Sequence, residues 1–110
     1  MFVLMKLKYT QYADTDEPVM LVNKHIGMDE EDGEGIMGDQ FQSELMYLDT
    51  LNKKRIKVVI CSPGGSVIEG MKMYNAVLTT KTKVDTYNGG IAASIAGVLF
   101  QIVGFIRTIG

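Results

Sequence analysis

The chain has 110 residues, enough for one small domain, residues 1–110, with a single modest core. A hydrophobic content of 46% with 22% charged residues is typical of a globular protein. The net charge of −2, without a basic block, argues against nucleic-acid binding, and the single cysteine rules out an intrachain disulfide and favours a reducing cytoplasm. The apolar N-terminal stretch is interrupted by Lys6 and Lys8, so no membrane span or signal peptide is expected.

The first third of the chain predicts an arm, a strand and an acidic loop. Apolar residues alternate along residues 1–12, as in a short strand, and residues 19–26 open with a continuous apolar run typical of a buried parallel strand. The next loop contains the acidic run Asp29–Asp32, but Met28 stands where a calcium loop needs an oxygen ligand. The pattern G-x-G-x-x-G at Gly33–Gly38 does not directly follow a strand, as a dinucleotide fingerprint requires. We therefore expect a solvated acidic loop, no metal and no cofactor.

Two helices are predicted from apolar residues spaced three and four positions apart. The first spans residues 39–51, and Asp39 followed by Gln42 has the spacing of a capping box. The second spans about residues 66–80. The residues expected to form one buried face in each helix are Phe41, Leu45 and Leu48 in the first, and Val67, Met71, Tyr74 and Leu78 in the second.

Two further strands alternate with these helices. Strands are predicted at residues 56–61, where β-branched side chains predominate, and at residues 81–87. A last helix, from Ser94 to about residue 103, is apolar around most of its circumference, so we expect it to be buried. This order of strands and helices predicts an α/β fold with parallel strands.

Two motifs stand where predicted strands end. Ser62-Pro63-Gly64-Gly65 is a turn whose glycines leave backbone N–H groups accessible, and such groups can stabilise an oxyanion. The run Tyr87–Ala96 carries one hydroxyl, that of Ser94, among small residues at a strand-to-helix junction. A serine at one strand end and a diglycine turn at another predict an acyl-transfer site.

The two motifs resemble those of the ClpP family, the serine peptidases that form the proteolytic subunits of Clp proteases. The family pattern is roughly I-N-S-P-G-G followed by G-x-A-A-S, and the resemblance extends over about residues 18–102 in order, spacing and context. It implies a ClpP/crotonase-like right-handed β-α-β spiral, truncated before its C-terminal part. Cys61 departs from the pattern, which usually has asparagine there, and we expect it to pack as a small apolar residue.

The resemblance also implies roles for individual residues. Ser94 is the implied nucleophile, and the backbone N–H groups of Gly65 and Ile95 are the implied oxyanion hole. The residues implied to border the substrate strand are Gly64, Ser66 and Val67.

The base that a serine nucleophile needs is the missing part. In ClpP peptidases a histidine and an aspartate follow the serine, and we expect both positions to lie beyond Gly110. The only histidine, His25, precedes the acidic loop, where the family has no catalytic residue, so we expect a packing or surface role. No lysine follows Ser94 either.

Three functions compete on this basis. The first is a serine endopeptidase that cuts unfolded polypeptides within a homo-oligomeric ring fed by an ATP-driven unfoldase, with phage head maturation as a variant. The second is a non-catalytic subunit or remnant that assembles without cleaving. The third is a crotonase-like acyl-CoA enzyme, which shares the spiral and the oxyanion hole but needs no serine at position 94. The Ser62–Gly65 turn favours the peptidase.

Overall fold

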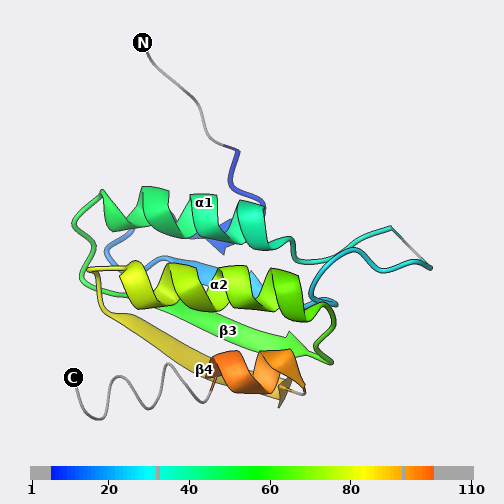
Figure 1. Cartoon of the computed structure of the whole chain (residues 1–110). Helices are drawn as coiled ribbons and strands as arrows, with labels where there is room; N and C mark the ends of the chain where they lie inside the picture. The colour runs from blue at the N-terminus through cyan, green and yellow to red at the C-terminus, as the bar shows by residue number, and fades with distance from the viewer. Residues whose placement is uncertain (1–5, 32, 93, 101–110) are drawn as a thin grey trace.

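The computed structural model describes residues 6–31, 33–92 and 94–100. Four strands form one sheet whose spatial order, β1-β2-β3-β4, follows the chain (Figure 1). β1 pairs antiparallel with β2, while β2, β3 and β4 are parallel to one another, so the predicted parallel α/β arrangement is confirmed. The strands span Thr10–Gln11, Val19–Val22, Ile56–Ser62 and Val84–Ala92.

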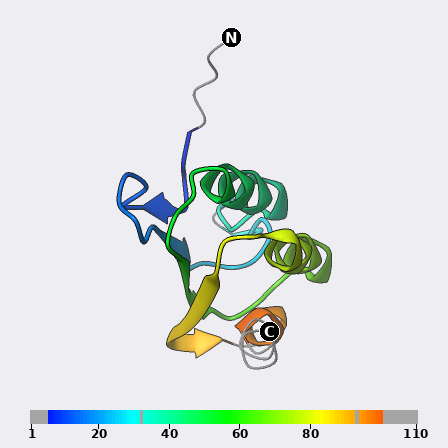
Figure 2. The same cartoon turned by 90° about the vertical axis from the view of Figure 1, so that its left-hand side faces the viewer.

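Helices cover one face of this sheet. α1 (Gly38–Asp49) connects β2 to β3, α2 (Val67–Thr79) connects β3 to β4, and a helical segment at residues 95–100 follows β4. Figures 1 and 2 show α1 and α2 side by side, with the short segment beside α2 on the same face of the sheet. The described part of the chain thus forms two layers with the core between them. No helix within it is long and apolar enough to cross a membrane.

The core forms where α1 meets the sheet. Buried and partly buried residues alternate along β3, so its buried side chains point to one face of the sheet. This alternation is expected for a strand that helices cover on one face only. The predicted apolar face of α1 is confirmed, because its three residues have no exposed surface. The buried side chains of the two elements are Ile56, Val58, Ile60 and Ser62 in β3, and Phe41, Leu45 and Leu48 in α1.

The predicted buried face of α2 is wrong. Val67, Met71 and Leu78 are 61%, 40% and 46% exposed, and only Tyr74 is partly packed against the core. The residues of α2 that are buried are instead Gly70, Met73, Ala76 and Val77. Because α2 is apolar on more than one side, periodicity does not select the inner face. The small residues among the buried set allow the neighbouring elements to come close.

Several predicted element boundaries also need correction. β2 ends at Val22, and Ile26 makes only single parallel bridges, to Ile36 and Gly65. β4 covers residues 84–92 rather than 81–87, with an irregular register opposite Cys61. The strand therefore continues through the glycines before Ser94.

The predicted capping box at α1 is wrong. Met37 is the N-cap residue of α1 and makes no side-chain capping bond. Asp39 lies inside the helix, where its carboxylate is 3.3 Å from Nζ of Lys72 in α2. Glu69 of α2 supplies the acceptor for this helix start, since its Oε1 lies 3.0 Å from the Gly38 N–H. A side chain from a neighbouring helix thus replaces the local cap.

A buried carboxylate attaches the N-terminal arm to α1. Glu44 has no exposed surface, and its oxygens accept hydrogen bonds from the backbone N–H groups of Lys8 and Tyr9 at 3.0 Å. They also accept from the Thr10 hydroxyl at 2.8 Å and the Gln40 amide at 2.6 Å. These donors satisfy a charge that would otherwise be costly to bury, and they place the arm where β1 can pair with β2.

We expect Leu45→Ala to lower the free energy of unfolding by about 2–5 kcal/mol, because it leaves a cavity in the core between α1 and the sheet. Met46, the next residue, is 56% exposed, so Met46→Ala should change stability by less than about 0.5 kcal/mol. Urea unfolding of the two variants measures the difference. Equal effects would contradict the packing of α1 described above.

Candidate active site

The diglycine turn is held by hydrogen bonds on both sides. At the end of β3, the Ser62 hydroxyl accepts a hydrogen bond from the Gly64 N–H at 3.1 Å. On the other side, the Ile26 N–H donates to the Gly64 carbonyl and the Ser66 N–H donates to the Ile26 carbonyl, both at 2.8 Å. The turn is therefore clamped between its own strand and the segment that follows β2.

Gly65 occupies a position that admits only glycine. Its φ of +146° is rare for residues with a side chain, and a Cβ there would lie 2.1 Å from the Ile26 carbonyl oxygen. Among the described residues, none accepts a hydrogen bond from the Gly65 N–H. The turn therefore presents one backbone donor that the fold leaves available.

His25 packs against this turn. A Cβ on Gly65 would lie 2.7 Å from Cε1 and 2.8 Å from Nε2 of the His25 ring, so the imidazole covers one side of the glycine. Its Nδ1 is 3.1 Å from the Gly27 carbonyl oxygen. The half-buried ring has the packing role expected for it, but its proximity to the turn is not evident from the sequence, because 40 positions separate the two residues.

Ser94 lies at the predicted strand-to-helix junction. β4 ends at Ala92, the helical segment begins at Ile95, and the Ser94 side chain is exposed between them. Ser94 itself is not helical but has a φ of +55°, in the left-handed region. For a residue other than glycine this conformation costs about 1–3 kcal/mol and is concentrated at functional sites. A nucleophile raised on such a turn is also the geometry of a nucleophile elbow.

Two contacts place Ser94 at the same end of the sheet as the diglycine turn. Before it in the chain, Ala92 is the register partner of Ser62, the last residue of β3. After it, the Ile95 side chain packs directly on Gly70 of α2, where a Cβ would lie only 2.2 Å from Ile95 Cγ1. Ser62 and Gly70 lie on either side of the turn in sequence. Ser94 therefore lies at the same end of the sheet as the turn.

The residues expected to border a substrate lie at the start of α2. The Ser66 hydroxyl caps α2 by accepting a hydrogen bond from the Glu69 N–H at 3.2 Å. Val67 is the first residue of the helix, and it is 61% exposed. Gly64, with a φ of +97°, precedes them in the turn. Their contact with substrate stays a prediction.

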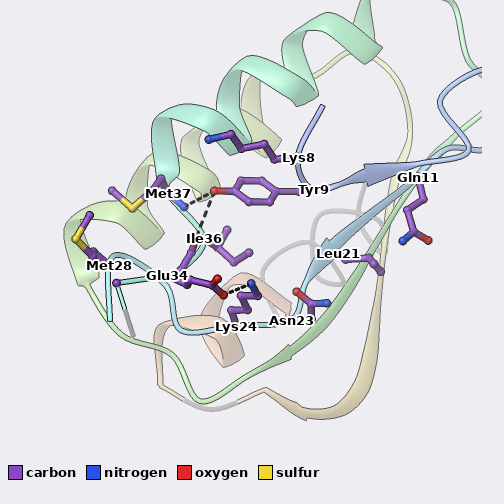
Figure 3. A pocket seen from close by; sticks show the side chains of 12 residues that line it. Lys8, Tyr9, Gln11, Leu21, Asn23, Lys24, Met28, Glu34, Ile36 and Met37 are labelled. Carbon is purple, nitrogen blue, oxygen red and sulfur yellow. Dashed lines mark hydrogen bonds and ion pairs between the residues drawn. The ribbon is translucent and has the colours of Figure 1, made fainter. Parts of the chain in front are cut away.

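A cavity of about 600 Å³ lies elsewhere, between the N-terminal arm, the end of β2 and the loop before α1 (Figure 3). The Tyr9 hydroxyl accepts a hydrogen bond from the Met37 N–H at 2.9 Å and lies 3.4 Å from the Gly35 carbonyl oxygen, so it fixes that loop. Lys24 pairs with Glu34 in the same region and lowers the pKa of Glu34. Ser94 and the diglycine turn do not line this cavity. No cluster of metal-ligating side chains occurs among residues 6–31, 33–92 and 94–100.

We expect Gly65→Ala to destabilise the chain by about 3 kcal/mol or more, since the new Cβ meets both an unfavourable φ and a backbone oxygen. Gly33 is a matched control with a φ of +72° and no atom near its missing Cβ, so Gly33→Ala should cost only about 1–2 kcal/mol of backbone strain. Urea unfolding compares the two. A smaller loss for Gly65→Ala would show that the turn is not clamped as described.

Comparison with known proteins places these features in a family. The family model for Clp protease matches residues 11–104. The ATP-dependent Clp protease proteolytic subunit of Carsonella ruddii is 42% identical over 66 residues, which cover 60% of this chain and 34% of that protein. The corresponding subunit of Bacteroides fragilis is 42% identical over 59 residues, covering 53% of this chain and 28% of that protein.

Solved structures agree with the sequence comparisons. The ClpP protease catalytic domain from Plasmodium falciparum has a TM-score of 0.64 and 28% identity, with coverage of 80% of this chain and 43% of that one. A ClpP1 mutant from Listeria monocytogenes has a TM-score of 0.65 at 22% identity, covering 83% of this chain and 47% of that one, which shows the shared fold. The chain spans about a third of the length of the curated relatives it matches. The chain belongs to the Clp protease family, of which it contains the N-terminal portion of the ClpP fold.

Proposed function

We propose that this chain carries the nucleophile and oxyanion-binding half of a ClpP-like serine endopeptidase, with Ser94 as the nucleophile. The observation that carries the proposal is the exposed Ser94, with its left-handed backbone, at the same end of the sheet as a diglycine turn. The Gly65 N–H of this turn has no acceptor among the described residues. A pocket for an acyl group needs both elements, a hydroxyl and a preorganised donor.

The reaction follows from these positions. The Ser94 oxygen attacks the scissile carbonyl carbon, and the carbonyl oxygen becomes an oxyanion. The N–H of Gly65 and the N–H of Ile95 donate to that oxyanion, because neither has an acceptor within the described part of the chain. The proton of Ser94 requires a base, and residues 95–110 contain neither histidine nor lysine. We propose that this base belongs to the portion of the ClpP fold that this chain does not span.

The proposed substrates and partners come from the family. The substrate is an unfolded polypeptide, delivered by an ATP-driven unfoldase to a ring of identical subunits. Apolar side chains exposed on one side of α2 support assembly, since a monomer leaves them in water. They are Val67, Ile68, Met71 and Leu78, with exposures of 61%, 72%, 40% and 46%.

One observation favours a second candidate, a subunit that assembles without cleaving. Among the 110 residues, His25 is the only histidine, and its ring is already packed on Gly65 with Nδ1 directed at the Gly27 carbonyl. A chain without another base would retain the surface for assembly but only the electrostatic part of catalysis. Binding of an acyl-CoA, the crotonase alternative, has no comparable support.

We expect the 110-residue chain to hydrolyse a fluorogenic peptide at a rate up to about 10⁶-fold below that of a complete enzyme, because loss of the base costs about that factor. A chain extended with the histidine- and aspartate-bearing portion of a ClpP relative should recover activity. Ser94→Ala in the extended chain should abolish it, whereas Ser43→Ala, at an exposed position of α1, should not.

Two outcomes would contradict the proposal. Activity of the extended chain that survives Ser94→Ala would exclude Ser94 as the nucleophile. Turnover by the 110-residue chain that disappears on His25→Ala would show that the base is His25 and that no further portion is needed.

A further inference from the structure

Gly70 in α2 is a glycine that local conformation does not require. It lies within the helix, its φ is not positive, and its N–H donates to the Ser66 carbonyl at 3.0 Å. Glycine in a helix interior is less favourable than alanine. Glycine is therefore required at position 70 because no space remains for a side chain. The nearest atoms around the missing Cβ all belong to Ile95.

Ile95 leaves no room for a side chain at position 70. A Cβ on Gly70 would lie 2.2 Å from Cγ1, 3.2 Å from Cγ2 and 3.3 Å from Cβ of Ile95. Carbon atoms in contact lie about 3.5–4.0 Å apart, so the two segments would have to separate by about 1 Å. The clash involves the branched base of the side chain, which moves little without its backbone. Any residue larger than glycine at position 70 therefore displaces the backbone of Ile95.

The displaced backbone carries the proposed site. Ile95 supplies one proposed oxyanion donor and directly follows Ser94, while Gly70 lies one helical turn after Ser66, which follows Gly65. The contact between Gly70 and Ile95 thus fixes the second donor and the nucleophile relative to the first donor. A displacement of about 1 Å in such a site can reduce a rate by about 10²-fold.

We propose that Gly70 is a positioning residue, which sets the distance from Ser94 and the Ile95 N–H to the diglycine turn through its contact with the Ile95 side chain. This inference rests on the proposed function of Ser94 and deepens it. It assigns to the first turn of α2 a role in the chemistry that neither sequence motif contains.

The test uses a thiol at position 94, which reports on nearby N–H donors without needing a base or peptide hydrolysis. In the 110-residue chain, Ser94→Cys is combined with Cys61→Ala so that only one thiol is present. The rate of alkylation by iodoacetamide is measured against pH, because the thiolate is the reactive form. If the two N–H groups converge on position 94, the midpoint of this profile lies below the ordinary thiol value of about 8.5.

Adding Gly70→Ala should raise the midpoint, with the rate at pH 7 falling about threefold for each pH unit by which it rises. Asn75→Ala, at an exposed position of the same helix, is the control and should leave the profile unchanged. A Gly70→Ala variant that changes thermal stability but not the profile would overturn the positioning role. A midpoint already at the ordinary value before Gly70 is changed would overturn both this inference and the convergence on which it rests.

A compensating substitution decides the question even if Gly70→Ala alone does not fold. Ile95→Ala removes Cγ1 and Cγ2 while keeping the backbone N–H. It should raise the midpoint of the alkylation profile, because residue 95 no longer contacts Gly70 of α2. Combining it with Gly70→Ala restores contact, since the two β-carbons are then 3.3 Å apart before relaxation. We expect the double variant to have a lower midpoint than Ile95→Ala alone. The same or a higher midpoint would contradict the inference, whereas peptidase inactivity of the extended chain would bear only on the proposed function.

Discussion

The structure depends on places where another part of the chain lies so close to a backbone segment that only glycine fits there. At Gly65 the turn lies against the Ile26 carbonyl, and at Gly70 the helix α2 lies against Ile95. A third such contact joins Gly35 to the Gly27 carbonyl in the loop before α1, where a Cβ would fall within 1.7 Å of the oxygen. The contacts at Gly65 and Gly70 connect segments that are far apart in the chain, and both border the proposed site. Glycine here provides proximity rather than flexibility.

Buried charge holds the elements around these contacts. Asp85, at the start of β4, is 1% exposed, and its carboxylate lies 3.1 Å from the guanidinium of Arg55, which precedes β3. The same guanidinium lies 3.0 Å from Glu17, before β2. Because Asp85 is buried, its charge needs partners within the protein, and Arg55 is one of them. The ion pairs thus link the N-terminal ends of β2, β3 and β4. Ser94 follows the opposite, C-terminal end of β4.

The two ends of the sheet are held by different kinds of contact. Charged and polar contacts fasten one end of the sheet and the N-terminal arm, where Glu44 binds the backbone of Lys8 and Tyr9. At the other end, backbone hydrogen bonds hold the diglycine turn, and Ala92 pairs in register with Ser62 just before the strained Ser94. The N–H groups of Gly65 and Ile95 have no acceptors there among the described residues. Strain at one residue persists only where the surrounding fold enforces it. Charged side chains therefore stabilise one end of the sheet, whereas backbone pairing and close packing at glycines stabilise the end where Ser94 lies.

The α/β order, the inner face of α1, the strand-to-helix junction at Ser94 and the family could all be predicted from the order of amino acids alone. They rest on local patterns, since apolar spacing, a diglycine turn and a run of small residues can each be read within a few positions, and the order of these patterns indicates the fold class and the family. Four features become visible only in the folded chain: the inner face of α2, the continuation of β4 to Ala92, the packing of His25 on Gly65 and the contact of Ile95 with Gly70. These depend on contacts between residues far apart in the chain. An apolar helix or a glycine has no local signal that says which distant segment will lie against it.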